Sequence, residues 1–281
     1  MKSDNILVIG GTGKTGSRVV SKLENQRYPV RVGSRNGTPA FDWENPETFD
    51  PVLKSMDRVY ITYHPDLAVP GAKEAIEKLT EAALRQGVEK VVLLSGKGEQ
   101  EAEACEEIVA HSGLNYTLVR ASWFNQNFSE SIFLESILAG QVALPMPEAE
   151  VPFVDADDIA DVVVKVLLDD SYNGKTITVT GPRKLTFRAV IEEIAIVTGR
   201  TISFTAITLE AYIEGMKLAG VPQDYIWLLG YLFKEVLGNA ENQTVSDDFE
   251  KVMGRPATDF SEFVTKTEKS GVWKQTITQS V

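Results

Sequence analysis

The chain contains very few of the residues that form disulfides or bind transition metals. Of its 281 residues, one is a cysteine, Cys105, and two are histidines, His64 and His111. A single cysteine excludes an intramolecular disulfide, and these three residues cannot make a compact zinc site. We therefore predict no metal site and a reducing, cytoplasmic setting.

Basic residues and long apolar runs are also scarce. Lys and Arg number 28 against 40 Asp and Glu, which gives a formal net charge of −12. So acidic a chain is repelled by nucleic-acid phosphates and anionic lipid, and its apolar runs fall short of the roughly 20 residues that span a membrane. The opening residues, MKSDNILVIGG, lack the apolar core of a secretion signal. We predict no nucleic-acid partner and no membrane.

Short β-rich runs alternate with longer helical patterns through the first two thirds of the chain, which is typical of βαβ units. The predicted strands are 5–9, 30–33, 40–43, 58–62, 90–94, 116–120 and 176–180. The predicted helices are 13–24, 46–55, 69–86, 99–111, 126–138 and 158–168. Residues 6–9 and 91–94 are apolar without interruption, as expected of parallel strands buried on both faces. The sequence predicts an α/β fold, a Rossmann-type doubly wound parallel sheet.

From about Thr186 the alternation gives way to helical segments rich in large apolar residues. We predict a Rossmann domain over residues 1–181, with an excursion into a second lobe at 123–153, and a smaller, mostly helical lobe over 182–281. The acidic stretch 99–107 is predicted to be a solvated helix face.

The turn after the first strand is Gly10-Gly11-Thr12-Gly13-Lys14-Thr15-Gly16. It satisfies both G-x-G-x-x-G and G-x-x-G-x-x-G between a predicted strand and a predicted helix. In that context glycines permit a tight turn and close approach to a dinucleotide pyrophosphate, which the N–H groups of the helix N-terminus then bind. A Walker A loop is disfavoured, because Val8 occupies the position of its first glycine. All seven residues of the turn are predicted to bind the cofactor.

The end of the second strand indicates which dinucleotide is preferred. NAD sites place an acid about 20 residues past the glycines, against the ribose hydroxyls, whereas NADP sites use arginine against the 2′-phosphate. Between Glu24 and Asp42 the chain has no acid. Ser34 and Arg35 fall where the strand meets the ribose, so we predict that they bind the 2′-phosphate and that NADP(H) is preferred over NAD(H).

The usual proton donor of short-chain dehydrogenases is missing. Those enzymes use Tyr-x-x-x-Lys, in which the ammonium lowers the pKa of the tyrosine. None of the eight tyrosines here has a lysine four residues further on. Direct hydride addition to an already electrophilic acceptor fits this absence.

Several segments resemble the NmrA-like group of atypical short-chain dehydrogenases, which includes quinone reductases, redox-sensing regulators and ergot-alkaloid reductases. The segments are the glycine turn, Phe41-Asp42-Trp43, Leu93-Leu94-Ser95, residues 119–128 (VRASWFNQNF) and residues 154–160 (VDADDIA). The resemblance covers nearly the whole chain. The Phe-Asp-Trp and Ser-Trp-Phe elements are most similar to the festuclavine and agroclavine dehydrogenase branch.

The resemblance implies where the rest of the cofactor lies. Asp42 and Trp43 are expected beside the adenine, and Thr62 and Tyr63 along the dinucleotide. The nicotinamide is expected between Ser95 and Trp123, and the substrate residues are Trp123, Phe124 and Asn127. Hydrophobic core is the alternative role for Trp123 and Phe124.

Three residues are candidates for catalysis: Ser95, Lys97 and His64. Many relatives carry a lysine early in the helix after the strand that ends at Ser95, but this chain has Ala102 there, and Lys97 is the nearest replacement. A histidine such as His64 can protonate a substrate near neutral pH. Asp155, Asp157 and Asp158 resemble a calcium loop, but its sixth position, Ala160, is not glycine, so we predict instead that Asp155 or Asp157 caps a helix.

Two functions follow. The first is an NADPH-dependent oxidoreductase that transfers hydride to a small electrophilic acceptor (an iminium, quinone or enone) bound in the helical lobe. The alternative is a non-catalytic NADP(H)-binding redox sensor that binds a protein partner, which requires different partner affinities in its oxidised, reduced and empty states.

Overall fold

The computed structural model describes residues 4–274, which form two compact units. The first unit comprises residues 4–122, 156–179 and 246–256, and the second comprises 123–155, 180–245 and 257–274. The chain therefore passes between the units several times. The assignment of domains by function, 1–181 for the cofactor and 182–281 for the substrate, stays a prediction.

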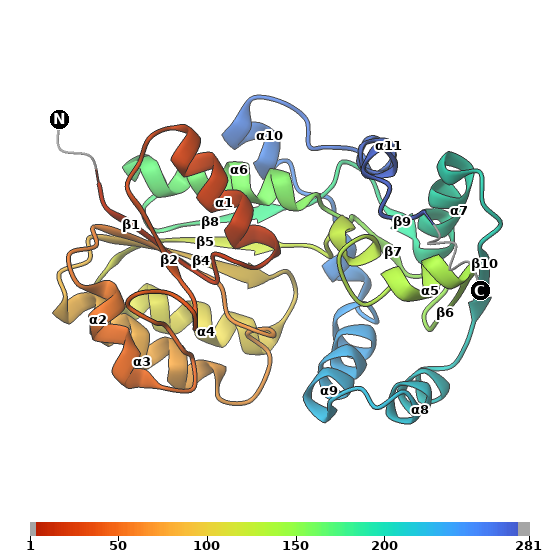
Figure 1. Ribbon diagram of the computed structural model, residues 1–281, viewed down its shortest axis with the longest axis horizontal. Helices are drawn as coiled ribbons and strands as arrows, with labels where there is room; N and C mark the ends of the chain where they lie inside the picture. Colours follow the sequence, from red (N-terminus) through yellow and green to blue (C-terminus); the bar gives the residue numbers. More distant parts are fainter. Residues whose placement is uncertain (1–3, 275–281) are drawn as a thin grey trace, which may run out of the picture. The chain divides into compact units, whose positions relative to one another are not determined.

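The first unit is built around a six-stranded sheet in which all neighbouring strands run parallel (Figure 1). Its strands, in spatial order, are β2 (Val30–Gly33), β1 (Ile6–Ile9), β3 (Arg58–Ile61), β4 (Lys90–Gly96), β5 (Asn115–Ala121) and β8 (Lys175–Val179). The chain leaves β1 to one side for β2 and returns on the other side for β3. This reversal of strand order creates the crevice at which doubly wound sheets bind ligands.

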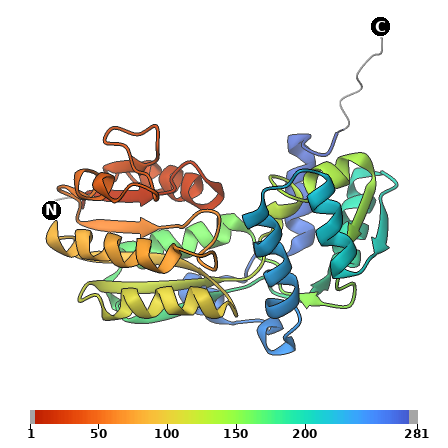
Figure 2. The same cartoon turned by 90° about the horizontal axis from the view of Figure 1, so that it is seen from below.

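Helices cover both faces of this sheet (Figures 1 and 2). One face carries α1 (Lys14–Asn25), α6 (Ala156–Leu168) and α10 (Asp248–Met253), and the other carries α2 (Phe49–Leu53), α3 (Ala72–Arg85) and α4 (Gln100–His111). Every residue of β1 is buried, and α3 buries Ala72, Ile76, Leu79 and Ala83 at helical spacing. The predicted Rossmann-type doubly wound sheet is confirmed.

The second unit contains more helix than strand. Its helices are α5 (Leu134–Ala139), α7 (Phe187–Thr198), α8 (Leu209–Leu218), α9 (Gln223–Tyr231), which continues into a π-helical turn (Leu232–Val236), and α11 (Phe260–Ser270). Two small sheets pair β6 (Gln141–Leu144) with β10 (Ser203–Ala206) and β7 (Glu150–Val151) with β9 (Leu185–Thr186). Its core is largely aromatic: Phe128, Phe133, Phe153, Phe187, Phe233, Phe260, Phe263 and Trp273 are all buried. The sequence does not indicate these short strands.

Two predicted elements are wrong. Residues 40–43 are not a strand, because Phe41 and Trp43 are packed against Phe49 in a loop whose turn is closed by the bond from Glu44 N–H to Asp42 Oδ1. The predicted helix 126–138 is broken into a 3₁₀ turn (Asn125–Phe128) and α5. Among residues 4–274, no helix has the length and apolar character needed to cross a membrane.

Candidate functional site

The glycines after β1 are required by the backbone around them. Gly10 has a φ of +71°, and a Cβ there would collide with Oγ1 of Thr62. A Cβ on Gly16 would lie 2.7 Å from the carbonyl carbon of Gly10 and 2.8 Å from Cα of Gly11. The turn thus brings the start of α1 against the end of β1 at a distance that only glycine permits.

The N-terminus of α1 is arranged to bind an anion through its main chain. Its N-cap is Gly13, no side chain caps it, and its first turn contains no acidic residue. The positive end of the helix dipole is therefore not neutralised from within the first turn. Thr15, predicted as a cofactor residue, is buried, and its hydroxyl accepts from the Tyr60 hydroxyl at 2.9 Å.

Two arginines lie near the end of β2, and only the first of them, Arg31, is hydrogen-bonded within the described residues. Arg31 donates to the carbonyl oxygens of Val52 and Lys54, at 2.7 and 2.9 Å. Arg35 is exposed and makes no hydrogen bond or ion pair with residues 4–274. Ser34 is partly buried, and its carbonyl accepts from Gly37 and Phe41 N–H, which shapes the loop that presents Arg35.

An aromatic cluster lies beside the end of β3. Trp43 and Tyr63 are partly buried with ring centroids 4.7 Å apart, and Trp43 also contacts Phe41 and Phe49 edge to face. Asp42 is occupied locally, because its carboxylate accepts from Glu44 N–H at 3.1 Å. The structure therefore brings Trp43 and Tyr63 together as one aromatic wall.

The ends of β3 and β4 are adjacent and carry the three candidates for catalysis. His64 follows β3 and is exposed, whereas Ser95 in β4 is 4% exposed and its Oγ has no hydrogen-bond partner among the described residues. Burial lowers the pKa of Lys97, in the loop after β4. Ala102 is part of the hydrophobic core, so no side chain of α4 replaces the missing lysine from that position.

The prediction of a solvated acidic face at 99–107 is wrong for two of its residues. Glu99 and Glu106 are 7% and 3% exposed. Glu106 is held by Arg120, whose Nε lies 2.9 and 3.0 Å from its two oxygens. Burial, followed by the negative charge of the neighbouring Asp66, raises the pKa of Glu99 well above its usual range. The acidic composition of this segment therefore does not show that two of its glutamates, Glu99 and Glu106, are buried.

The single cysteine lies near this cluster but is not reactive. Cys105 is buried, and its Sγ lies 3.9 Å from the carbonyl oxygen of Leu67. Burial raises the pKa of its thiol to about 12. The nucleophilic thiolate is therefore scarce at neutral pH.

The predicted substrate residues are in the second unit. Trp123 is partly buried, and its ring packs on Phe187 and Phe233 with centroids 5.5 and 5.3 Å away. Phe124 and Asn127 are also partly buried, and the carbonyl of Phe124 accepts from Asn127 N–H. Trp123 thus lies at the edge of the aromatic core, and its contact with a cofactor or substrate stays a prediction.

Sequence reasoning missed Asn125, which lies between these residues. It is completely buried, and neither its Oδ1 nor its Nδ2 has a hydrogen-bond partner among the described residues. Gln126, next to it, donates to Asp155 at 2.8 Å. No local pattern marks the burial of an asparagine in a polar segment.

The remaining aspartates of residues 155–158 are structural. Asp157 pairs with Arg18 at 2.9 Å and Asp158 with Arg255 at 2.7 Å. Within residues 4–274 no group of three His, Cys, Asp or Glu side chains is placed to hold a metal ion.

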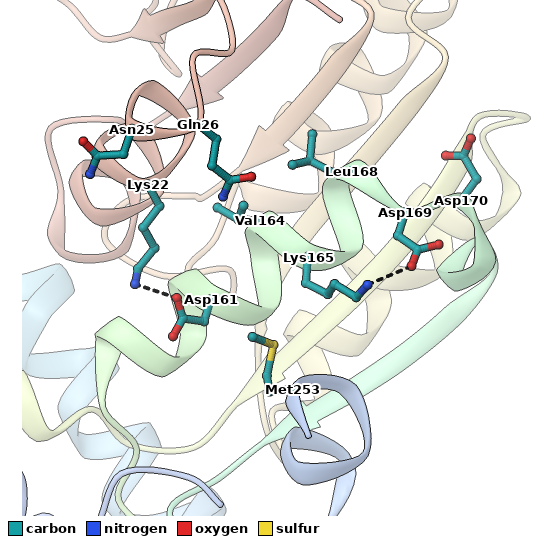
Figure 3. Close-up of a pocket in the computed structure, with 10 residues that line it drawn as sticks. All are labelled: Lys22, Asn25, Gln26, Asp161, Val164, Lys165, Leu168, Asp169, Asp170 and Met253. Carbon is teal, nitrogen blue, oxygen red and sulfur yellow. Dashed lines mark hydrogen bonds and ion pairs between the residues drawn. The ribbon is translucent and has the colours of Figure 1, made fainter. Parts of the chain in front are cut away.

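A pocket of about 730 Å³ lies elsewhere in the first unit (Figure 3). It is lined by the last turn of α1, by α6 and by Met253, and its lysines Lys22 and Lys165 are paired with Asp161 and Asp169. Because α1 begins at the glycine turn, its last turn lies roughly 15 Å from that turn. The pocket is therefore separate from the candidate cofactor site.

The glycine turn, the crevice and the sheet order define a dinucleotide-binding protein of the Rossmann type. The chain matches the NAD(P)H-binding family over residues 10–170 and belongs to that family.

Several of its relatives are named oxidoreductases or dehydrogenases. It is 31% identical to the oxidoreductase YesF of Bacillus subtilis over 94% of this chain and 95% of that protein. It is 29% identical to the NAD(P)H azoreductase of Xenophilus azovorans, over 92% and 96% of the two chains. It is also 27% identical to agroclavine dehydrogenase of Claviceps fusiformis, over 95% and 98%.

Solved structures share the fold at lower identity. The NADPH complex of an NADPH-dependent quinone oxidoreductase from Escherichia coli has a TM-score of 0.78 at 18% identity, over 93% of this chain and 99% of that one. The NADP(H) complex of triphenylmethane reductase from Citrobacter sp. has a TM-score of 0.74 at 19% identity, over 94% and 99%. The protein is thus an NAD(P)H-binding oxidoreductase of this family.

Proposed function

We propose that the protein is an NADPH-dependent reductase that transfers hydride to a small electrophilic acceptor, such as a quinone, an iminium or an enone. One observation carries this proposal: the glycine turn and the N-terminus of α1 form an anion site, and the neighbouring strand end presents an exposed arginine. Together they suit a pyrophosphate and a second phosphate on the adenine ribose.

The preference for NADPH rests on Arg35. Among residues 4–274 it has no ionic partner to compete with a 2′-phosphate, whereas Arg31 is engaged with main-chain carbonyls. No acid lies between Glu24 and Asp42 to accept from a free 2′-hydroxyl. Ser34 supports the phosphate beside Arg35, and Trp43 with Tyr63 provides a wall for the adenine end.

The class of acceptor is proposed from the missing proton donor, Tyr-x-x-x-Lys, and from the names of the relatives. Without Tyr-x-x-x-Lys, acceptors that take hydride readily are favoured over simple ketones. The named relatives reduce azo compounds or act on agroclavine, and a structural neighbour reduces quinones. The edge of the aromatic core at Trp123 suits a planar apolar substrate.

Cofactor choice is tested by titrating the protein with NADPH, NADP⁺, NADH and NAD⁺ while tryptophan fluorescence is recorded. We expect NADPH to bind at least tenfold more tightly than NADH, and Arg35→Ala to abolish most of that difference. Arg27→Ala is the matched control, because Arg27 is also exposed but precedes β2 at its opposite end. An unchanged ratio of dissociation constants in Arg35→Ala contradicts the assignment.

Turnover is tested with a panel of quinones, cyclic iminium compounds and enones by loss of NADPH absorbance. Consumption of NADPH that depends on an acceptor supports the reductase. Tight NADPH binding without turnover on any acceptor would instead favour the redox sensor. A sensor must bind its protein partner with different affinities in the NADP⁺-bound, NADPH-bound and empty states, which pull-downs in these three states would measure.

A further inference from the structure

One face of α9, in the second unit, carries an aromatic ring that is not buried. Trp227 is 41% exposed, more than any other aromatic side chain among residues 4–274, whereas Ile226 and Leu229 of the same helix are buried. Tryptophan is usually kept largely out of water, because its ring has a large apolar area. The indole of Trp227 therefore leaves apolar surface that the described part of the chain does not cover.

Tyr231 lies one turn further along α9 and extends this surface. The rings of Trp227 and Tyr231 are parallel to within 5°, with centroids 5.5 Å apart. Rings in direct face-to-face contact have centroids about 3.5 Å apart, so these two rings are laterally offset and neither covers the other completely. The pair therefore forms parallel aromatic faces on which a planar molecule can stack.

An acidic side chain lies on the same face of the helix. Asp224 is in the first turn of α9, three residues before Trp227, and residues at this spacing are neighbours on a helix surface. Its carboxylate is exposed and makes no hydrogen bond or ion pair with residues 4–274. This face thus combines a negative charge with two aromatic rings.

The charges around this face do not neutralise it. Residues 209–236, which include α8, α9 and the π-helical turn, contain four acids and two lysines. Both lysines, Lys217 and Lys234, are already paired with neighbouring glutamates, at 3.5 and 2.8 Å. Two acids remain in excess, so this segment attracts cations and repels anions.

We propose that Asp224, Trp227 and Tyr231 form a binding site for a planar aromatic cation, and that the acceptor of the reductase belongs to this class, as an aromatic iminium does. The negative faces of the rings attract a cation that stacks on them, and Asp224 adds a direct charge interaction. A neutral acceptor gains only the stacking. The choice of acceptor rests on the proposed reductase function, whereas the binding site itself does not.

The same helix leads to the edge of the aromatic core. Phe233, in the π-helical turn after α9, packs on Trp123 with ring centroids 5.3 Å apart. Trp227 precedes Phe233 by six residues, which corresponds to a rise of roughly 9 Å along a helix. The cation site therefore lies in the same unit as the predicted substrate residues and is joined to them by one continuous helical segment.

N-methylacridinium is a suitable probe, because it is planar, cationic and an aromatic iminium. NADPH gives a hydride, with both electrons of its C–H bond, to the ring carbon opposite the nitrogen. The electron pair displaced from the ring neutralises the nitrogen, so that NADP⁺ and neutral N-methylacridan are formed and no proton is needed. The product has lost the charge that the site recognises, so it should bind more weakly than the acceptor.

Binding is measured first, without NADPH, from the fluorescence of N-methylacridinium and of acridine, its uncharged counterpart above neutral pH. An exposed cation–π contact and an exposed ion pair together should favour the cation by about 3- to 30-fold in dissociation constant. Asp224→Asn should weaken binding of the cation by about two- to fivefold and leave that of acridine unchanged. Salt at about 1 M should remove this effect of the substitution, because it screens exposed charges.

Trp227→Leu should weaken the binding of both dyes by about three- to tenfold, because leucine is apolar but has no ring. Glu262→Gln is the matched control for Asp224→Asn. Glu262 is also an exposed acid in the first turn of a helix, α11, which lies apart from α9 (Figure 1). This control should leave both dissociation constants unchanged, and thermal unfolding of each variant checks the fold.

Equal affinity of the wild type for the two dyes, or unchanged affinity of Asp224→Asn for the cation, would overturn the cation site. Turnover separates this result from failure of the proposed function. Asp224→Asn should raise the KM for N-methylacridinium as well as its dissociation constant. A wild type that binds the cation as expected but reduces no acceptor refutes the reductase and supports the site, whereas one that reduces quinones without preferring the cation refutes the site alone.

Discussion

Replacing Gly16 with alanine tests the glycine turn directly. The new Cβ would lie 2.7 Å from the carbonyl carbon of Gly10 and 2.8 Å from Cα of Gly11, and closer still to the Gly10 carbonyl oxygen. All three are backbone atoms, so no side chain can rotate away. To reach an ordinary carbon–carbon separation of about 3.5 Å, the start of α1 must move from the turn by roughly 0.8 Å.

Two opposing effects set the loss of stability. Overpacking of this kind typically costs about 1–3 kcal/mol, and alanine in a helix gains about 1 kcal/mol over glycine. We therefore expect Gly16→Ala to lower the free energy of unfolding by no more than about 2 kcal/mol. The protein should stay folded, which makes its affinity measurable.

The effect on cofactor affinity should be larger. A shift of nearly 1 Å misaligns the N–H groups of the α1 N-terminus, and a hydrogen bond to a charged group contributes about 1.5–3 kcal/mol. Loss of one such bond raises the NADPH dissociation constant by about 10- to 10²-fold. Fluorescence titration measures this change, and thermal unfolding checks the fold.

Gly215→Ala is the matched control. Gly215 lies in α8, and a Cβ there would meet nothing within 4 Å. This change should raise stability by about 0.4–1 kcal/mol and leave the dissociation constant unchanged. A folded Gly16→Ala protein that binds NADPH like the wild type would refute the turn as the pyrophosphate site.

Three further changes have defined outcomes. The pKa of Glu99 is raised in the native state, so that state keeps a proton that the unfolded chain releases, and the free energy of unfolding should fall as pH rises above the usual glutamate pKa, by up to about 1.4 kcal/mol per pH unit. Urea unfolding between pH 5 and about 8 should show a flatter decline of this free energy in Glu99→Gln than in the wild type. An equally steep decline would contradict the raised pKa. Trp273→Phe removes the buried hydrogen bond from the Trp273 ring N–H to the carbonyl of Phe128, which is 2.8 Å long. The free energy of unfolding, measured by thermal unfolding, should fall by about 1–3 kcal/mol. A fall below about 0.5 kcal/mol would argue against that bond. Tyr60→Phe removes the 2.9 Å hydrogen bond to the Thr15 hydroxyl, so the free energy of unfolding should fall by about 1 kcal/mol while the NADPH dissociation constant stays unchanged. Weaker NADPH binding would mean that the Thr15 hydroxyl contacts the cofactor.

The sequence predicts the first unit better than the second because the strands of its sheet are short apolar runs with helical segments between them. Residues 6–9 and 91–93 are buried in the parallel sheet and Leu94 is partly buried, so pattern and structure largely coincide. The loop 40–43 misleads because aromatic residues favour strands by propensity, yet here their rings are buried against Phe49 without strand pairing. The two-residue strands β7 and β9 depend on contacts between distant segments, which no local pattern records.

The sequence also predicts those parts of the candidate site best whose residues are consecutive along the chain. The glycine turn is contained in seven consecutive residues, and the constraints on Gly10 and Gly16 arise from atoms within that turn or from Thr62 beside it. The environment of Glu99 instead depends on Asp66, 33 positions away in the sequence, and composition alone marks Glu99 as one acid in an exposed helix. The formal charge of −12 counts every acid alike. Burial and the charge of Asp66 raise the pKa of Glu99 above the usual glutamate range, and this effect of the fold cannot be read from a count of charged residues.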